Sequence, residues 1–85
     1  MAWKVIIDPS VAKGLKKINR TDRYYIKGAI DEMNLNPYTG DIRNITGQTN
    51  IWRKRVGAYR IFYEINLSLK IVHIFKIERR TSTTY

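Results

Sequence analysis

The first part of the chain combines a short strand pattern with a short helix pattern. Apolar and polar residues alternate loosely in the segment "WKVIID", which predicts a first strand that ends at Asp8-Pro9. Ser10 is of a residue type that often caps helices, and apolar residues spaced by four and then three positions follow it. The pattern predicts a short amphipathic helix whose buried face is formed by Val11, Leu15 and Ile18.

A second helix is predicted after a turn at residues 19–20. Thr21 can cap this helix, and Asn36-Pro37 is expected to end it, because proline cannot continue a helix. Its predicted buried stripe contains Tyr24 or Tyr25, then Ile26, Ala29, Ile30 and Met33. The segment that follows, residues 38–50, is rich in Gly, Thr and Asn and is expected to be a loop.

Beyond residue 50 the apolar positions recur with a period of two. This pattern predicts three strands: Ile51–Val56, Tyr59–Ile65 and Leu69–Ile77. Their short connections favour antiparallel neighbours. We therefore expect a single α+β domain over residues 1–85, with two N-terminal helices packed on a mainly antiparallel sheet in the order β-α-α-β-β-β.

The predicted strand Ile51–Val56 divides its residues between the two faces of the sheet. Successive side chains of a strand point to opposite faces, so Arg53 and Arg55 are expected on one face. The other face receives Trp52, Lys54 and Val56. Because the two helices can fully cover only one face, the face with the arginines is free to become a concave, cationic surface.

The distribution of charge supports such a surface. The net charge is +9; residues 1–42 contain seven Lys/Arg against five Asp/Glu, and residues 43–85 contain nine against two. Six of the nine later cations are arginines, which form planar, bidentate contacts with phosphate or carboxylate groups. We therefore expect the C-terminal half to face nucleic acid, an anionic membrane surface or an acidic protein.

Length and composition exclude several classes of protein. Eighty-five residues, 44% of them hydrophobic and 27% charged, fit one globular domain with a modest core. The absence of cysteine excludes a disulfide scaffold and a thiolate metal site. No apolar run approaches the ~20 residues that a membrane span needs, and the N-terminus does not resemble a signal peptide, so a cytoplasmic protein is expected.

The order of the predicted elements and three sequence segments resemble the RelE/ParE superfamily of toxins from toxin-antitoxin pairs, and most closely its RelE branch. The segments are the strand "WRKR", the strand "AYRIFY" and the end of the chain, "IERRTSTTY". The resemblance spans nearly the whole chain and is most specific from Trp52 to Tyr63. It implies a RelE-like fold and a toxin that enters the ribosomal A site, cleaves mRNA and thereby inhibits translation.

The same resemblance assigns roles to individual residues. Arg53 and Arg55 stand where RelE-type enzymes keep paired lysines, and Arg60 matches the arginine of the "YR" strand. The resulting candidate catalytic residues are Arg53, Arg55, Arg60, Arg79 and Tyr85, and the candidate RNA-binding residues are Lys54 and Arg80.

Arginine suits one part of RNA cleavage and not another. Its guanidinium group stays charged and binds two phosphate oxygens, so it can stabilise the extra negative charge of a pentavalent phosphorane. For the same reason arginine is a poor proton shuttle, and the identity of the general base stays open. Tyr85 is expected to shuttle a proton or to stack on a nucleobase.

Other conspicuous side chains are expected to be structural. His73 lies in mid-strand and is expected to be a packed or partly exposed sheet residue rather than a catalytic histidine. The aromatic residues of the central strands are expected in the core: Trp52, Tyr59, Phe62 and Tyr63.

The expected partners are a small acidic, RelB-like antitoxin and the ribosome with its mRNA. The antitoxin would cover the basic surface and the apolar groove between helices and sheet. No metal, cofactor or membrane partner is expected, since the sequence has no His/Cys/Asp/Glu cluster with ligand spacing. Two alternatives stay open: a ParE-like inhibitor of DNA gyrase, and a catalytically inactive RelE-fold protein that only binds the antitoxin.

Overall fold

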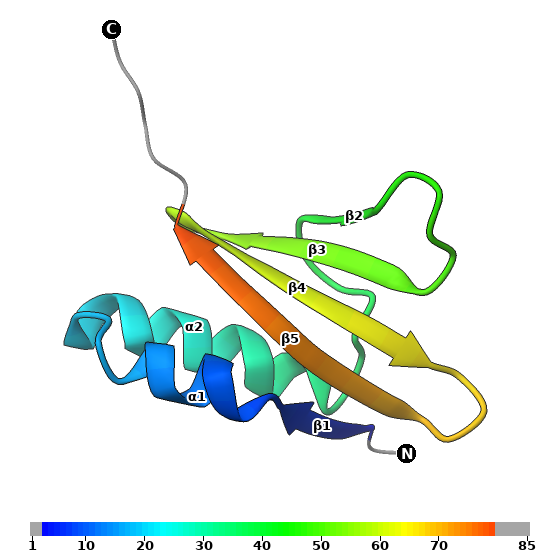
Figure 1. Ribbon diagram of the computed structural model, residues 1–85, viewed down its shortest axis with the longest axis horizontal. Coiled ribbons are helices and arrows are strands. Elements are labelled where there is room, and N and C mark those ends of the chain that lie inside the picture. The colour runs from blue at the N-terminus through cyan, green and yellow to red at the C-terminus, as the bar shows by residue number, and fades with distance from the viewer. Residues whose placement is uncertain (1–2, 80–85) are drawn as a thin grey trace, which may run out of the picture.

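The computed structural model describes residues 3–79, which form two helices and one five-stranded sheet (Figure 1). In chain order the elements are β1 (Lys4–Ile7), α1 (Pro9–Leu15), α2 (Arg20–Met33), β2 (Ile42–Asn44), β3 (Ile51–Val56), β4 (Tyr59–Asn66) and β5 (Ile71–Arg79). The predicted α+β class and the two N-terminal helices are confirmed. Both helices lie on the same side of the sheet (Figure 1).

The strands follow the order β1-β5-β4-β3-β2 across the sheet. β1 runs parallel to β5, and the other neighbouring strands are antiparallel. β1 pairs with β5 only from Ile71 to Ile74. The remaining edge of β5, residues 75–79, therefore has no strand beside it within the described chain.

The segment that the sequence predicts as a loop contains β2. This strand runs antiparallel to β3 and places its residues opposite Lys54, Arg53 and Trp52 in turn. β2 is short and mostly exposed, so it has no hydrophobic period of its own; it forms because β3 offers a free edge. The Tyr63 hydroxyl donates a buried hydrogen bond of 2.9 Å to the Pro37 carbonyl, which holds the start of the segment against the sheet.

Both helices are capped two residues earlier than predicted. The Asp8 carboxylate accepts hydrogen bonds from the Ser10 hydroxyl at 2.7 Å and the Ser10 backbone N–H at 3.0 Å, and these bonds lower the pKa of Asp8. Asp8 is the cap because Pro9 fits the first helical position, where no N–H is needed. In α2 the cap is Asn19, whose side chain accepts a 2.9 Å hydrogen bond from the Asp22 N–H, rather than Thr21.

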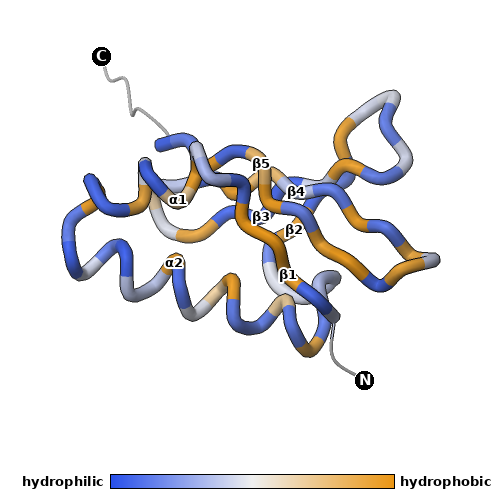
Figure 2. The backbone as a smooth tube through the Cα atoms, turned by 60° about the horizontal axis from the view of Figure 1, so that its bottom comes forward, coloured by the Kyte–Doolittle hydropathy of each residue, from blue (hydrophilic) through white to orange (hydrophobic). Residues whose placement is uncertain are grey.

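The core lies between the helices and the sheet face that they cover. Burial alternates along β4, whose buried residues are Tyr59, Ile61, Tyr63 and Ile65. From α2 the core receives Ile26, Ala29, Ile30 and Met33, as predicted. Figure 2 shows hydrophobic stretches along β1 and β5, whereas hydrophobic and hydrophilic residues alternate in short stretches along α2.

Two tyrosines of α2 do not join this core. Tyr24 and Tyr25 are 74% and 61% exposed, so their predicted place in the buried stripe is wrong. The core positions of α2 repeat every three or four residues from Ile26, and successive residues of a helix are rotated by about 100°, which turns the tyrosines toward solvent.

We call the sheet face opposite the helices the open face.

Candidate functional site

The open face carries two rows of residues that run across the strands. Directly opposite residues of antiparallel neighbours share a face and lie about 5 Å apart. One row runs from β2 to β5 through Arg43, Arg53, Phe62 and Lys76. The next row runs from β3 to β5 through Arg55, Arg60 and Glu78. Arginine therefore stands directly opposite arginine twice, once between β2 and β3 and once between β3 and β4.

Carboxylates partly neutralise one of these two arginine pairs. Arg55 Nε lies 3.0 Å from Asp41 Oδ2, and Arg60 Nη1 lies 3.5 Å from Glu78 Oε1. The pair between β2 and β3 forms no ion pair within the described part of the chain. Like charges directly opposite each other destabilise a sheet, so an anion bound at this second pair would relieve their repulsion.

The structure brings together three of the five predicted catalytic residues. Arg53, Arg55 and Arg60 lie on the open face, in adjacent positions of β3 and β4. The predicted alternation along β3 is confirmed, because Lys54 points to the covered face and is only 4% exposed.

The burial of Lys54 corrects its expected role in RNA binding. Its ammonium Nζ lies 3.1 Å from Glu32 Oε1 of α2, and its side chain is 5% exposed. An ammonium enclosed in this way and paired with a carboxylate cannot reach an RNA phosphate without opening the contact between α2 and the sheet. Lys54 therefore joins the sheet to α2.

Arg79 is separated from the arginines of the open face. It lies opposite Tyr59 in the sheet, with its guanidinium carbon 6.0 Å from the Tyr59 ring centroid on the covered side. The cause is a β-bulge between the pairs that β4 forms with Lys76 and Ile74, which shifts the alternation of β5 by one residue. Arg79 therefore lies apart from the other predicted catalytic residues, and its catalytic role stays a prediction. Arg80 and Tyr85 lie outside the described residues.

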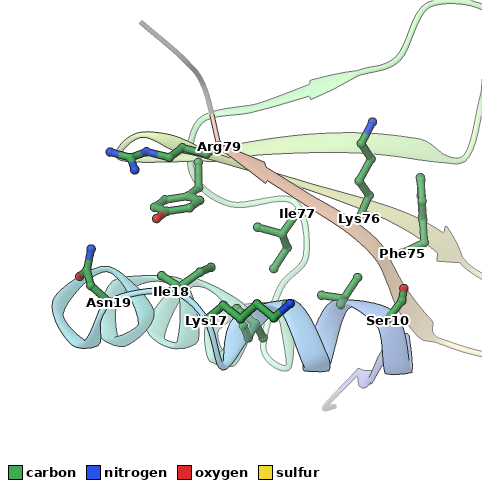
Figure 3. Close-up of a pocket in the computed structure, with 12 residues that line it drawn as sticks. Ser10, Lys17, Ile18, Asn19, Phe75, Lys76, Ile77 and Arg79 are labelled. Atoms are coloured by element: carbon green, nitrogen blue, oxygen red, sulfur yellow. The ribbon is translucent and has the colours of Figure 1, made fainter.

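A groove runs between α1 and the free edge of β5 (Figure 3). It has a volume of about 590 Å³, and its lining includes Val11, Leu15, Lys17, Ile18, Ile77 and Arg79. Tyr59 lies at the same groove and donates a 3.2 Å hydrogen bond to Asp22 Oδ2. Burial, followed by this hydrogen bond, raises the pKa of Tyr59. The groove thus combines apolar walls with cations and an unpaired strand edge.

The open face also includes residues that the sequence reasoning missed or misplaced. Arg43 lies in a segment whose composition predicts a loop, so the sequence carries no signal that places it on the sheet. Phe62 was expected in the core but lies on the open face, opposite Arg53. Strict alternation could have found Phe62, since its neighbours Ile61 and Tyr63 are the buried residues of β4. Lys76 could not be placed from the sequence, because the bulge precedes it.

Few groups on the open face can exchange a proton. Glu78 is held between two cations, with Oε2 3.4 Å from Lys76 Nζ and Oε1 next to Arg60. His73 Nε2 lies 3.7 Å from Asp8 Oδ2, and the His73 side chain is 39% exposed, as predicted for a partly exposed sheet residue. Residues 3–79 contain no group of three or more His, Cys, Asp or Glu side chains that could hold a metal ion.

The helices of the described chain are too short or too polar to cross a membrane.

The sequence is similar to known toxins over almost its whole length. The family model for the ParE toxin of the type II toxin-antitoxin system parDE matches residues 5–83. The candidate toxin RelE1 of Methanocaldococcus jannaschii is 30% identical over 83 residues, which cover 94% of this chain and 92% of that relative.

Solved structures share the fold. The archaeal RelE in the RelE–RelB complex from Pyrococcus horikoshii OT3 has a TM-score of 0.85 at 24% identity, covering 98% of this chain and 100% of that chain. The match to the RelB–RelE complex from Methanococcus jannaschii has a TM-score of 0.72 at 27% identity and covers 87% of this chain and 88% of that chain. The isolated E. coli RelE toxin matches with a TM-score of 0.83 at 17% identity, covering 96% of this chain and 88% of that chain. Because the family model matches nearly the entire sequence and the relatives agree with it in sequence and fold, this chain belongs to the RelE/ParE family of type II toxins.

Proposed function

We propose that this toxin is a ribosome-dependent endoribonuclease that cleaves mRNA in the A site and thereby inhibits translation. The observation that carries the proposal is the open face, where arginine stands opposite arginine twice on three neighbouring strands. Guanidinium groups stay charged and bind two phosphate oxygens at once, so this arrangement suits an RNA backbone. The matched relatives named RelE support the RelE branch of the family.

The arginines supply electrostatic stabilisation in this reaction. The 2′ oxygen attacks the adjacent phosphorus, the 5′ oxygen leaves, and the phosphorane between these states carries extra negative charge. Arg53 and Arg60 are diagonal neighbours on the open face, so their guanidinium groups can converge on one phosphate. Such preorganised donors stabilise the transition state more than the ground state, which is what accelerates the reaction.

The proton transfers need a different group. Arginine stays protonated, and we propose Tyr85 as the residue that shuttles a proton or stacks on a base near the scissile phosphate. The Tyr85→Phe variant keeps the ring and removes the hydroxyl. If Tyr85 transfers a proton, this variant loses cleavage; if Tyr85 only stacks, cleavage stays near the wild-type rate.

The test of the main proposal is to map the 5′ ends of cellular mRNA after the toxin is induced. We expect new ends inside translated codons, and purified toxin should cut mRNA on ribosomes but not the same mRNA alone. The matched family model is named for ParE, which favours gyrase inhibition as the second candidate. DNA damage with intact translation would replace the proposal with that candidate. Normal growth after induction would leave only an inactive antitoxin-binding protein.

We further propose that the partner is a RelB-like, acidic antitoxin whose segment occupies the groove beside α1. Several solved relatives are complexes of RelE with RelB, and the groove offers apolar walls, Lys17, Arg79 and the free edge of β5. An extended acidic segment can pair with such an edge and with the cations beside it. Lys17→Glu should weaken antitoxin binding tenfold or more, measured by calorimetry, whereas Lys27→Glu on α2 should not. Equal affinities for both variants would place the antitoxin elsewhere.

A further inference from the structure

The open face contains three aromatic rings that the core does not use. Phe62 and Phe75 have ring centroids 6.5 Å apart, and His73 and Phe75 are also separated by 6.5 Å. Phe75 is 36% exposed although it lies in the middle of β5. The core is on the other side of the sheet, so these rings are not needed to close it. We call His73, Phe62 and Phe75 the aromatic platform.

The bulge in β5 creates this platform. Pairing between β4 and β5 passes from Phe62–Lys76 directly to Tyr63–Ile74, which leaves Phe75 as the extra residue. In Figure 3 Phe75 and Lys76 both point away from α1, whereas Ile77 points toward it. Phe75 and Lys76 also border the groove beside α1. A regular strand would direct two such consecutive residues to opposite faces. The bulge instead adds a ring and a cation to the open face at the same place.

The platform is continuous with the cationic row. Lys76 Nζ lies 5.2 Å from the Phe62 ring centroid, and Phe62 is directly opposite Arg53, which is opposite Arg43. Neighbouring strands are about 5 Å apart, so Arg53 lies one strand and Arg43 two strands from Phe62. Proteins that bind single-stranded nucleic acid combine the same two parts, a positive groove for the backbone and aromatic rings on which bases stack.

We propose that the aromatic platform, with Phe75 as its exposed ring, stacks on an unpaired base of a single-stranded RNA whose backbone lies along the arginine row. This inference rests on the proposed function and adds to it the contact that positions a base, rather than a phosphate. Nucleic acid fits better than a second copy of the chain, because the surrounding cations would repel another open face. Phe75 contacts the RNA base directly in this proposal.

The experiment measures binding of the full chain, free of antitoxin, to a short single-stranded RNA that carries 2-aminopurine and 2′-O-methyl groups. The methyl groups block cleavage, and stacking quenches the 2-aminopurine fluorescence. Phe75→Leu keeps the apolar bulk but removes the aromatic face, so it should bind at least about fivefold more weakly, with little quenching. Phe75→Trp should restore both. Tyr24→Leu, which removes an exposed ring from α2, should behave as wild type.

An abasic version of the same oligonucleotide separates stacking from charge. The proposal expects Phe75→Leu and wild type to bind the abasic probe equally, because its phosphates are unchanged. Equal binding of the intact probe by both proteins, or no quenching by wild type, would overturn the inference while ribosomal cleavage could still stand. If binding depends on the base and on Phe75 but the toxin does not cleave mRNA on ribosomes, the stacking inference stands and the proposed function fails. If Phe75→Leu impairs only antitoxin binding, the platform is a protein contact and the inference fails.

Discussion

The two faces of the central strands put similar residues to opposite uses. Arg53 and Lys54 are consecutive in β3 and carry the same charge, yet Arg53 lies on the open face and Lys54 is buried under α2. Phe62 and Tyr63 are consecutive aromatic residues of β4, and only Tyr63 is in the core. The comparison teaches that the face of the sheet, and not the residue type, decides whether a cation or a ring is structural or available to a ligand.

The covered face accommodates a cation because the surroundings of Lys54 are built for it. Glu32 supplies the counter-charge from α2, and Gly40 leaves room for the lysine stem. A Cβ at Gly40 would lie 2.9 Å from Lys54 Cε, and the backbone there has a positive φ of 89°. On the open face, in contrast, arginines directly oppose each other and one such pair has no carboxylate partner within the described residues.

The largest expected effect on stability comes from truncating a core side chain on the covered face. Ile61 is fully buried, so Ile61→Ala should lower the free energy of unfolding by about 2–5 kcal/mol through lost burial and a cavity. Phe62→Ala, one residue away on the open face, should cost less than half as much. Urea denaturation of both variants measures the difference. Similar losses at the two positions would mean that the open face is packed as tightly as the core.

The next effect concerns activity rather than stability. Arg60→Ala should slow ribosomal mRNA cleavage about a hundredfold or more, since a lost transition-state donor typically costs ~3 kcal/mol. Lys54→Met is the matched control: it removes the same formal charge from the covered face and keeps the apolar stem. Cleavage by this control should stay near wild type. If both variants lose activity equally, bulk positive charge rather than the open face determines cleavage.

Lys54 itself offers a smaller and sharper test of the covered face. Lys54→Ala should destabilise the toxin by about 1–3 kcal/mol, because it removes buried methylene groups as well as the partner of Glu32. Lys54→Met should cost less than 1 kcal/mol, because it keeps the buried apolar stem and Glu32, whose side chain is 63% exposed, stays hydrated without its partner. Thermal unfolding distinguishes the two. Equal losses would assign the whole contribution of Lys54 to its charge.

The smallest expected effect is a pH dependence confined to the covered face. Burial raises the pKa of Tyr63 above its ordinary value, and burial raises that of Tyr59 as well. The folded state therefore binds the hydroxyl protons of these tyrosines more tightly than the unfolded state does. Their contribution to the free energy of unfolding is fully present below the unfolded pKa of about 10 and is lost as the pH rises beyond it.

Tyr63→Phe isolates this effect. At neutral pH it should cost about 1 kcal/mol through the lost hydrogen bond to the Pro37 carbonyl. Above pH ~10 its stability should decline less steeply than that of wild type, as measured by urea denaturation at several pH values. Tyr24→Phe, at an exposed position, should follow the wild-type curve. An unchanged slope in Tyr63→Phe would assign the alkaline loss to other groups.

The sequence by itself determined the features that depend on local patterns. The period of two in β3 and β4 predicted which residues of β3 share a face, and the stripe from Ile26 to Met33 predicted the core of α2. Arg53 and Arg55 could be grouped on one face because alternation along a regular strand needs no knowledge of the rest of the chain. Arg60 joins them because the two-residue turn at residues 57–58 fixes the register between β3 and β4 locally.

Only the tertiary structure decided the features that arise from pairing between distant segments. β2 exists because β3 has a free edge, so Arg43 could not be placed beside Arg53 from its own sequence. The bulge at Phe75 depends on the register between β4 and β5, and it moves Arg79 to the covered side while adding Phe75 and Lys76 to the open face. A single extra residue reverses every side chain beyond it, and local hydrophobic periodicity does not encode where two strands lose register.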